Sequence, residues 1–300
     1  MRNRNGEPAP QTDESAATAV VADAATATAT ATDIALAGPE GGFAEVVTAS
    51  VMHIGTRPYQ QDALYVTGFD RSSEWPEGQG GKAFGILCDG MGGLDNGEKA
   101  SNMAVYMVKE SLENLESFED IPSFFAEEAA RIDLAIQEEC SGEGKSAGTT
   151  LTAVVIFGGD LYWASVGDSR IYIIREGDIV KVNRDHTYMM LLRESVRKGN
   201  ITPEEAENHP LKASLISFLG SGHIRYIDTN ENPFRLVRGD IVLLCSDGLT
   251  KSLTPAEILD VVESHYGDMD SAANDLVIKA FDSSDGPKDN TSVVLLQYFE

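Results

Sequence analysis

Five aspartates stand where apolar, strand-like runs of the sequence begin or end. Asp89 follows the run FGILC, Asp247 follows IVLLCS, and Asp289 precedes NTSVVLLQYF. Asp62 precedes ALYVTGF, and Asp168 follows LYWASVG. A single aspartate at such a place is most often a turn residue that caps its own backbone. Two of the five share one form, an apolar run, a cysteine, in one case a serine, and then Asp-Gly. Five such aspartates together predict a cluster of carboxylates at one rim of a sheet.

Such a cluster needs cations. Three or more carboxylates in one cleft cannot all stay ionised, because like charges at that distance repel strongly. Oxygen ligands without a His/Cys set suit Mg²⁺ or Mn²⁺ better than Zn²⁺. Cys88 and Cys245 alternate with large apolar residues, so we interpret them as small core residues. His186, His209 and His265 show no ligand spacing, and we expect them at the surface or in a flap.

One arginine near the carboxylates could bind phosphate, whereas the sequence contains no nucleotide-binding loop. Arg57 precedes Asp62 by five residues in GTRPYQQD. On local grounds an ordinary loop arginine that balances the acidic patch and a bidentate clamp for phosphate oxygens fit this position equally well. The stretch GGLDNGEK has glycines at P-loop spacing but Glu98 where lysine is required, and before GEGKS the leading glycine is replaced by Glu139.

The acidic composition excludes several classes of partner. The 300 residues carry a formal net charge of −25, so the surface repels nucleic acid and anionic membranes. No apolar run is long enough for a membrane span, and the first residues lack the apolar core of a secretory signal. Three scattered cysteines do not make a disulfide framework. We therefore expect a cytoplasmic protein that binds neither nucleic acid nor membrane.

Eight strand-like runs and four helices must position these residues. The runs span residues 44–54, 63–69, 82–89, 150–157, 161–167, 170–176, 241–247 and 292–299. Glycine-containing turns in GGD and REGD predict two hairpins. Two amphipathic helices lie between the third and fourth runs, and two more follow residue 253. In TPAE, Thr254 is the expected N-cap, with proline next and Glu257 three residues on.

Hairpin-joined strands with inserted helix pairs do not alternate as β-α-β units. They predict an α+β fold, a central β-sandwich of two mostly antiparallel sheets with helices on the outer faces. Residues 1–43 are Ala/Thr-rich low complexity and predict a disordered tail, which leaves 44–300 as the globular domain. Residues 185–222 are polar and interrupted by Pro203 and Pro210, so we expect an insertion beside the site.

Together these motifs resemble the PP2C (PPM) family of metal-dependent serine/threonine protein phosphatases, in its bacterial form. The resemblance runs in order over roughly residues 48–299, through GTRPYQQDA, CDGMGG, SAGTT, VGDSR, DHT, GDIVLLCSDGL and DNTSVV. It implies a four-layer α-β-β-α sandwich with a binuclear Mn²⁺ or Mg²⁺ centre at one end. The implied activity is hydrolysis of phosphoserine and phosphothreonine on proteins, with 185–222 as a variable flap.

The resemblance also implies a role for each carboxylate. Asp89 would bridge both metal ions and so take part in catalysis, and Gly90 would offer its carbonyl oxygen to the second ion. Asp247 and Asp289 match ligands of the first ion. Asp62 matches the acid that reaches the second ion through water. Two ions about 3.5–4 Å apart would turn a bridging water into hydroxide, which attacks phosphorus in line.

Further residues complete this assignment or depart from it. Asp168 matches the residue linked to a third, weaker ion, and Arg57 matches the arginine that binds the substrate phosphate during catalysis. Gln61 stands where many relatives have glutamate. Met91 stands where eukaryotic relatives have a histidine acid, so the leaving alkoxide would take its proton from a metal-bound water. His53 is a distant alternative acid that we expect in strand packing.

The expected partners are phosphorylated proteins, including a bacterial Ser/Thr kinase and its targets, and we expect a monomer. Two other functions remain open from the residues. A catalytically silent module of the same fold would bind a partner without turnover, although such modules typically lose metal carboxylates that this sequence keeps. A phosphatase or phosphodiesterase of small molecules could use the same centre.

Overall fold

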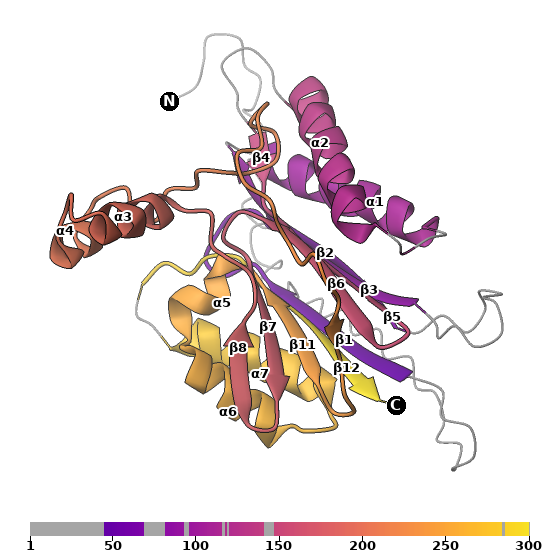
Figure 1. Ribbon diagram of the computed structural model, residues 1–300. Helices are drawn as coiled ribbons and strands as arrows, with labels where there is room; N and C mark the ends of the chain where they lie inside the picture. The colour runs from indigo at the N-terminus through magenta and orange to yellow at the C-terminus, as the bar shows by residue number, and fades with distance from the viewer. Residues whose placement is uncertain are drawn as a thin grey trace, which may run out of the picture.

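The computed structural model describes residues 45–68, 82–92, 96–115, 118, 120–140, 147–283 and 286–299. The segment 1–43, which we expect to be a disordered tail, lies outside the described residues. Two antiparallel sheets pack face to face, and helices cover the outer face of each (Figure 1). This arrangement confirms the predicted α+β sandwich.

Each sheet draws strands from distant parts of the chain. The first sheet contains β1 (Glu45–His53), β7 (Arg170–Arg175), β8 (Asp178–Lys181), β11 (Ile241–Cys245) and β12 (Thr291–Phe299), in the order β1-β12-β11-β7-β8. The second contains β2 (Asp62–Thr67), β3 (Lys82–Gly92), β5 (Leu151–Phe157), β6 (Asp160–Val166) and β10 (Phe234–Arg235), in the order β10-β6-β5-β3-β2. Two short strands join this sheet off the path, β4 (Ala147–Thr149) beside β3 and β9 (Asp228–Thr229) beside β6.

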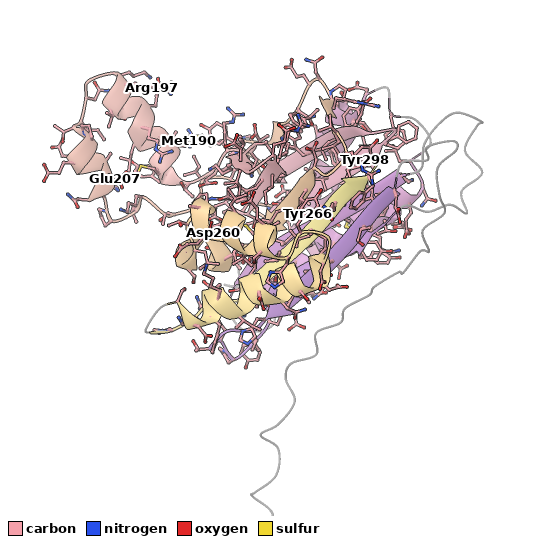
Figure 2. The ribbon with its side chains drawn as sticks, turned by 90° about the horizontal axis from the view of Figure 1, so that it is seen from below. Met190, Arg197, Glu207, Asp260, Tyr266 and Tyr298 are labelled. Atoms are coloured by element: carbon pink, nitrogen blue, oxygen red, sulfur yellow. The ribbon has the colours of Figure 1, made fainter. Side chains whose placement is uncertain are left out.

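The helices form three groups. The helices α1 (Asn96–Glu113) and α2 (Ile121–Cys140) cover the second sheet, and α5 (Asp247–Ser252), α6 (Pro255–Ser264) and α7 (Met269–Asp282) cover the first. The remaining pair, α3 (Tyr188–Arg197) and α4 (Pro203–Glu207), projects away from the sandwich in both views (Figures 1 and 2). Within the described part of the chain, no helix is both long and apolar enough to cross a membrane.

The central strands are apolar on both faces because each lies between a helix layer and the other sheet. In β3, Phe84 and Ile86 pack toward the helices while Leu87 packs between the sheets. In β12, Leu295 packs toward the helices and Leu296 between the sheets. Side chains of a strand alternate between faces, so burial on both sides produces the near-continuous apolar runs of the sequence.

Local signals place the element boundaries where the sequence predicts them. The turns in GGD and REGD close the β5–β6 and β7–β8 hairpins. Helix α6 begins with a capping box in which the Thr254 hydroxyl accepts from the Glu257 N–H and the Glu257 carboxylate accepts from the Thr254 N–H. Helix α4 begins in the same way at Thr202 and Glu205.

Two boundaries differ from the prediction, and both concern site residues. Strand β3 does not end at Asp89 but continues to Gly92, because β4 replaces β5 as its partner. Only Thr150 separates β4 from β5, and its N–H donates to the Asp89 carbonyl. Asp247 is not a strand residue but the first residue of α5.

Candidate metal centre

The carboxylates come together because the two sheets end at a common rim. Asp62 and Asp89 are directly opposite each other in the β2–β3 pair of the second sheet. In the first sheet β11 and β12 are antiparallel neighbours, so Asp247 after β11 lies near Asp289 before β12. A hydrogen bond of 2.7 Å from the Ser292 hydroxyl of β12 to Asp62 Oδ2 joins the two halves.

Asp62 is the most enclosed of the five aspartates, with a residue exposure of 3 %. Its Oδ2 accepts from Ser292, whereas its Oδ1 is buried and has no hydrogen-bond partner among the described residues. Burial raises the pKa of Asp62 to about 6, and the charges of Asp247 and Asp289 add to this shift. Asp62 is therefore a buried carboxylate with an uncompensated oxygen.

Asp89 is half-buried inside β3, and its backbone is held at the change of partner strand. Its N–H donates to the Thr150 hydroxyl, and its carbonyl accepts from Thr149 Oγ1 at 3.0 Å. Burial raises the pKa of Asp89 well above its usual value, and the charges of the other four aspartates, Asp62 first, raise it further. The ionised form of Asp89 is therefore disfavoured unless positive charge is supplied.

Gly90 is required by packing, whatever it binds. A Cβ atom at this position would lie 2.2 Å from the Gly97 carbonyl oxygen and 2.5 Å from that of Gln61. The Gly90 N–H also donates to the Gln61 carbonyl at 3.0 Å. This close approach of α1, β3 and the loop before β2 explains the glycine independently of the metal role that the sequence suggests.

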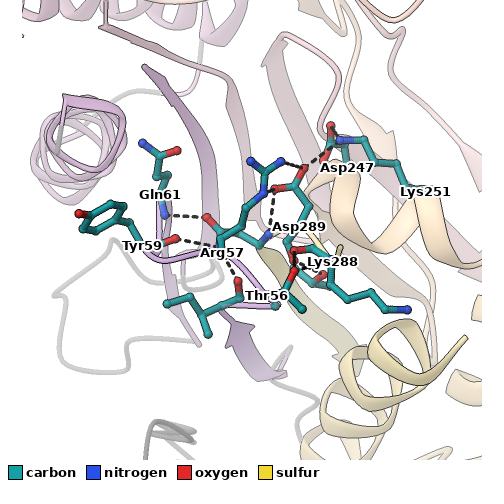
Figure 3. A network of polar contacts seen from close by, with 12 residues as sticks. Thr56, Arg57, Tyr59, Gln61, Asp247, Lys251, Lys288 and Asp289 are labelled. Atoms are coloured by element: carbon teal, nitrogen blue, oxygen red, sulfur yellow. Dashed lines mark hydrogen bonds and ion pairs between the residues drawn. The ribbon is translucent and has the colours of Figure 1, made fainter. Parts of the chain in front are cut away.

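Asp247 and Asp289 have cationic partners, of which Lys251 was not expected from the sequence. Lys251, one turn after Asp247 in α5, places its ammonium 2.5 Å from Asp247 Oδ2 and 3.1 Å from Asp289 Oδ2 (Figure 3). Arg57 forms a bidentate pair with Asp289, with Nε–Oδ1 and Nη2–Oδ2 distances of 3.0 Å. Of the two roles that the sequence left open for Arg57, the structure shows the pairing with the acidic cluster, and phosphate binding stays a prediction.

The pKa values of Asp247 and Asp289, the first-sheet pair, are shifted in opposite directions. Burial alone would raise the pKa of Asp289, but the hydrogen bonds and charges of Lys251 and Arg57 hold it below its usual value. Burial raises the pKa of Asp247, and Lys251 only partly opposes this. Asp247 Oδ1 is also buried without a hydrogen-bond partner among the described residues. Each sheet thus contributes one buried carboxylate oxygen that the described chain leaves uncompensated.

Asp168 lies in the bend between β6 and β7, beside the other four aspartates. Burial raises its pKa to about 7, with further contributions from the charges of Asp247 and Asp185. His186, which we expected at the surface or in a flap, lies at the start of the flap and is only 1 % exposed, so the surface alternative is wrong. Its N–H donates to the Gly167 carbonyl at 2.8 Å and its Nδ1 accepts from the Gly167 N–H at 3.2 Å, which fastens the start of the flap to the Asp168 bend.

Asn290 is a second residue that the sequence reasoning did not single out. Its side chain accepts from the Gln61 N–H at 2.8 Å and donates to the carbonyls of Ile54 at 2.8 Å and Tyr59 at 3.1 Å. These bonds hold the loop that carries Arg57 against the start of β12. The motif DNTSVV contained Asn290, but nothing in the sequence showed which distant backbone groups it would bind.

The donor set fits hard divalent ions, although the described residues contain no formed metal site. No three His, Cys, Asp or Glu side chains in that part of the chain are arranged as ligands of one ion. The available donors are carboxylate oxygens, as Mg²⁺ and Mn²⁺ prefer. The orphaned Oδ1 atoms of Asp62 and Asp247 indicate that the cluster lacks positive charge, since buried polar oxygens are normally paired. Cys88 and Cys245 are buried core residues.

Two further residues near the rim, His53 and Met91, are held by ring packing and strand pairing. His53, the distant alternative acid, accepts at Nδ1 from the Gly55 N–H, and its ring packs edge-on against Phe281 at 4.7 Å. This confirms its packing role. Met91 lies in the β3–β4 ladder opposite Gly148.

Comparisons with known proteins identify the family of the chain. The family model described as "Protein phosphatase 2C" matches residues 51–276. The serine/threonine phosphatase stp of Listeria welshimeri is 32 % identical over 217 residues, which cover 71 % of this chain and 83 % of that protein.

Two solved structures are similar in fold. The serine/threonine phosphatase of S. agalactiae has a TM-score of 0.72 and 30 % identity, covering 85 % of this chain and 100 % of that one. The catalytic domain of serine threonine protein phosphatase PstP, in complex with two manganese ions, has a TM-score of 0.64 and 26 % identity, covering 86 % and 100 %.

Proposed function

The chain belongs to the protein phosphatase 2C family of serine/threonine protein phosphatases, and we propose that it hydrolyses phosphoserine and phosphothreonine through water activated between two Mn²⁺ or Mg²⁺ ions. The observation that carries this mechanism is the pair of orphaned carboxylate oxygens, one from each sheet, at a rim where four aspartates meet. The two manganese ions of the PstP catalytic domain support the same number here.

The residues at the rim suggest which groups would hold the ions. Asp89, at the centre of the cluster, would bridge the two, with the Gly90 carbonyl on the second. Asp247 and Asp289 would hold the first ion, and Asp62 would reach the second through water. A third, weaker ion would lie at Asp168. When bound, the ions lower the pKa of a shared water so that it attacks phosphorus at neutral pH.

The chain's own residues would bind and orient the substrate. The Arg57 side chain is 56 % exposed, so its planar guanidinium can turn from Asp289 to two oxygens of a phosphate group. Asn290 would keep the Arg57 loop against the rim during this exchange. Lys251 would compete with a metal ion for the Oδ2 atoms of Asp247 and Asp289, whereas Asp247 Oδ1 is open to an ion without such an exchange.

Replacement of one ligand in metal-saturated protein tests the mechanism. Chelator-treated protein supplied with Mn²⁺ should hydrolyse p-nitrophenyl phosphate and phosphothreonine peptides. Asp247→Asn should lower kcat/KM by at least about a thousandfold, since loss of metal-ion stabilisation is worth several kcal/mol. Asp260→Asn, at an exposed position of α6, is the matched control and should leave the rate unchanged.

Other outcomes would contradict parts of the proposal. Metal-dependent turnover that survives Asp247→Asn would refute the ligand assignment. Turnover of p-nitrophenyl phosphate without turnover of any phosphopeptide would favour a small-molecule substrate.

The cellular setting follows from the same proposal. Because the similar proteins are bacterial phosphatases of serine and threonine, we expect this enzyme to act in the cytoplasm on a Ser/Thr kinase and its targets. A phosphoproteome of a deletion strain should show increased phosphoserine and phosphothreonine on those proteins. An unchanged phosphoproteome would contradict the opposition to a kinase.

A further inference from the structure

A cleft of about 1000 Å³ separates the flap, residues 185–222, from the end of the sandwich that carries the aspartates. Asp168 and Asp247 line it at the metal-centre end, while residues of α3 and α4 line its other wall. In Figure 2, Met190, Arg197 and Glu207 lie on the arm that projects from the body. The cleft therefore leads directly from the candidate metal centre along the flap.

Helix α3 turns one face toward this cleft. The lining residues Met189, Met190, Arg193, Val196 and Arg197 recur at the spacing of a single helical face. This face combines flexible apolar side chains with two guanidinium groups. Such a surface suits a polypeptide that carries both apolar and acidic groups.

The charge of the cleft is opposite to that of the chain. Seven cationic side chains and four carboxylates line it, whereas the whole chain has a formal net charge of −25. Two of those carboxylates, Asp168 and Asp247, belong to the candidate metal centre, so bound cations would make the cleft still more positive. An acidic ligand is therefore attracted to this one region of an acidic protein.

Arg193 is the cation of this wall that is available to a ligand. Several of the others are engaged in ion pairs, such as Arg184 with Asp228 and Lys212 with Glu207. The guanidinium of Arg193 is exposed, and no ion pair or hydrogen bond joins it to any residue that the structure describes.

We propose that this cleft binds the substrate polypeptide beside its phosphorylated residue and selects acidic side chains there, chiefly through Arg193. The inference rests on the proposed phosphatase function and names its substrate class. Helix α3 has ten residues and is about 15 Å long, and an extended peptide advances about 3.3 Å per residue. We therefore place the selected acidic residues within about five positions of the phosphorylated one.

The test uses phosphothreonine peptides that differ only in flanking residues, with glutamate, glutamine or lysine at the same positions. Manganese-saturated protein should show a kcat/KM for the glutamate peptide about tenfold above that for the lysine peptide, mainly through KM. This preference should shrink in about 0.5 M salt, because exposed charges are then screened. Arg193→Gln should lower the glutamate-to-lysine ratio about threefold, and Arg193→Glu about tenfold.

Two controls keep the outcomes separate. Arg238→Gln removes an exposed arginine that is not part of the cleft, and it should leave the ratio unchanged. Hydrolysis of p-nitrophenyl phosphate, which has no peptide, should be equal in all variants and so reports correct folding.

Equal kcat/KM for glutamate and lysine peptides in the parent protein would overturn the inference, as would equal effects of Arg193→Gln and Arg238→Gln. Absence of p-nitrophenyl phosphate turnover in the parent protein would instead overturn the proposed function.

Discussion

Each sheet brings two of the five aspartates to the rim, but among the described residues only the first-sheet pair has cationic partners. Asp289 of the first sheet is paired with both Arg57 and Lys251, and its pKa lies below the usual value. Asp89 of the second sheet forms no ion pair within the described chain, and its pKa lies well above the usual value. Its neighbour Asp62 accepts a hydrogen bond from a serine hydroxyl.

The difference shows which carboxylates depend on positive charge that the described side chains do not supply. A buried carboxylate is costly unless hydrogen bonds or cations compensate it. In the first-sheet half an ion-pair network stabilises ionised Asp289, although Asp247 Oδ1 has no partner among the described residues. In the second-sheet half, protonation or a bound cation would stabilise the carboxylate of Asp89. The same residue type in the same cluster therefore has opposite effects on stability.

Paired substitutions test this contrast most strongly. Asp89→Asn should lower kcat/KM by at least about a thousandfold, because it removes the proposed bridging ligand. In the presence of chelator it should raise the free energy of unfolding by about 1–2 kcal/mol, since it removes a buried uncompensated charge. Asp289→Asn should lower that free energy, because it breaks the pairs with Arg57 and Lys251. Urea titrations at about pH 7.5 measure both, and shifts of the same sign would contradict the contrast.

The pH dependence of stability gives a second, smaller effect. Folding raises the pKa of Asp62 from 3.8 to about 6, so the folded state binds more protons than the unfolded state between these values. The stabilisation that Asp62 contributes to chelator-treated protein is therefore fully present below about pH 4 and is lost as pH rises through about 6, by on the order of 3 kcal/mol. Asp168, with a pKa of about 7, extends the loss upward.

Manganese should reverse this dependence of stability on pH, because bound ions would hold the same carboxylates ionised. The rise in Tm on addition of Mn²⁺ should be larger at about pH 8 than at about pH 5. Parallel Tm curves with and without Mn²⁺ would contradict the assignment of Asp62 and Asp168 to the centre.

The smallest effect concerns Lys251, the cation that competes with metal for the first-sheet pair. Lys251→Met should tighten Mn²⁺ binding about tenfold in calorimetric titrations, because the ion no longer displaces an ammonium group. The same variant should melt at a lower temperature in chelator, because Asp247 and Asp289 then repel each other. Lys198→Met, which removes a comparable lysine four residues after Glu194, is the control for both measurements. Weaker Mn²⁺ binding in the Lys251 variant would show that the lysine supports the ions.

Much of the fold could be predicted because it depends on local patterns. The hairpin turns, the α6 capping box and the double-sided burial of β3 and β12 all leave marks within a few residues of sequence. The cluster of strand-end aspartates was predictable for a similar reason. Antiparallel strands of a sandwich end at common rims, so their terminal residues meet.

The remaining features depend on contacts between distant segments. Nothing local showed that β4 would extend β3 beyond Asp89, or that Asp247 would start a helix and so turn Lys251 back toward it. His186 has polar neighbours in the sequence, so its burial could not be predicted. The burial comes from contact with the Asp168 bend, which is not adjacent in the chain. Asn290 bonds to backbone groups more than 200 positions away, which no spacing pattern reveals.

The Asn290 contacts also determine when an active molecule can exist. The bond from Gln61 to Asn290 spans 229 positions, and that from Ser292 to Asp62 spans 230. Strand β12 leaves the ribosome after every other described element, so a nascent chain has Asp62 and Asp89 but not the residues that join them to the other sheet. We therefore expect dephosphorylation to begin only after synthesis of this strand, so that an unfinished chain does not act on phosphoproteins near the ribosome.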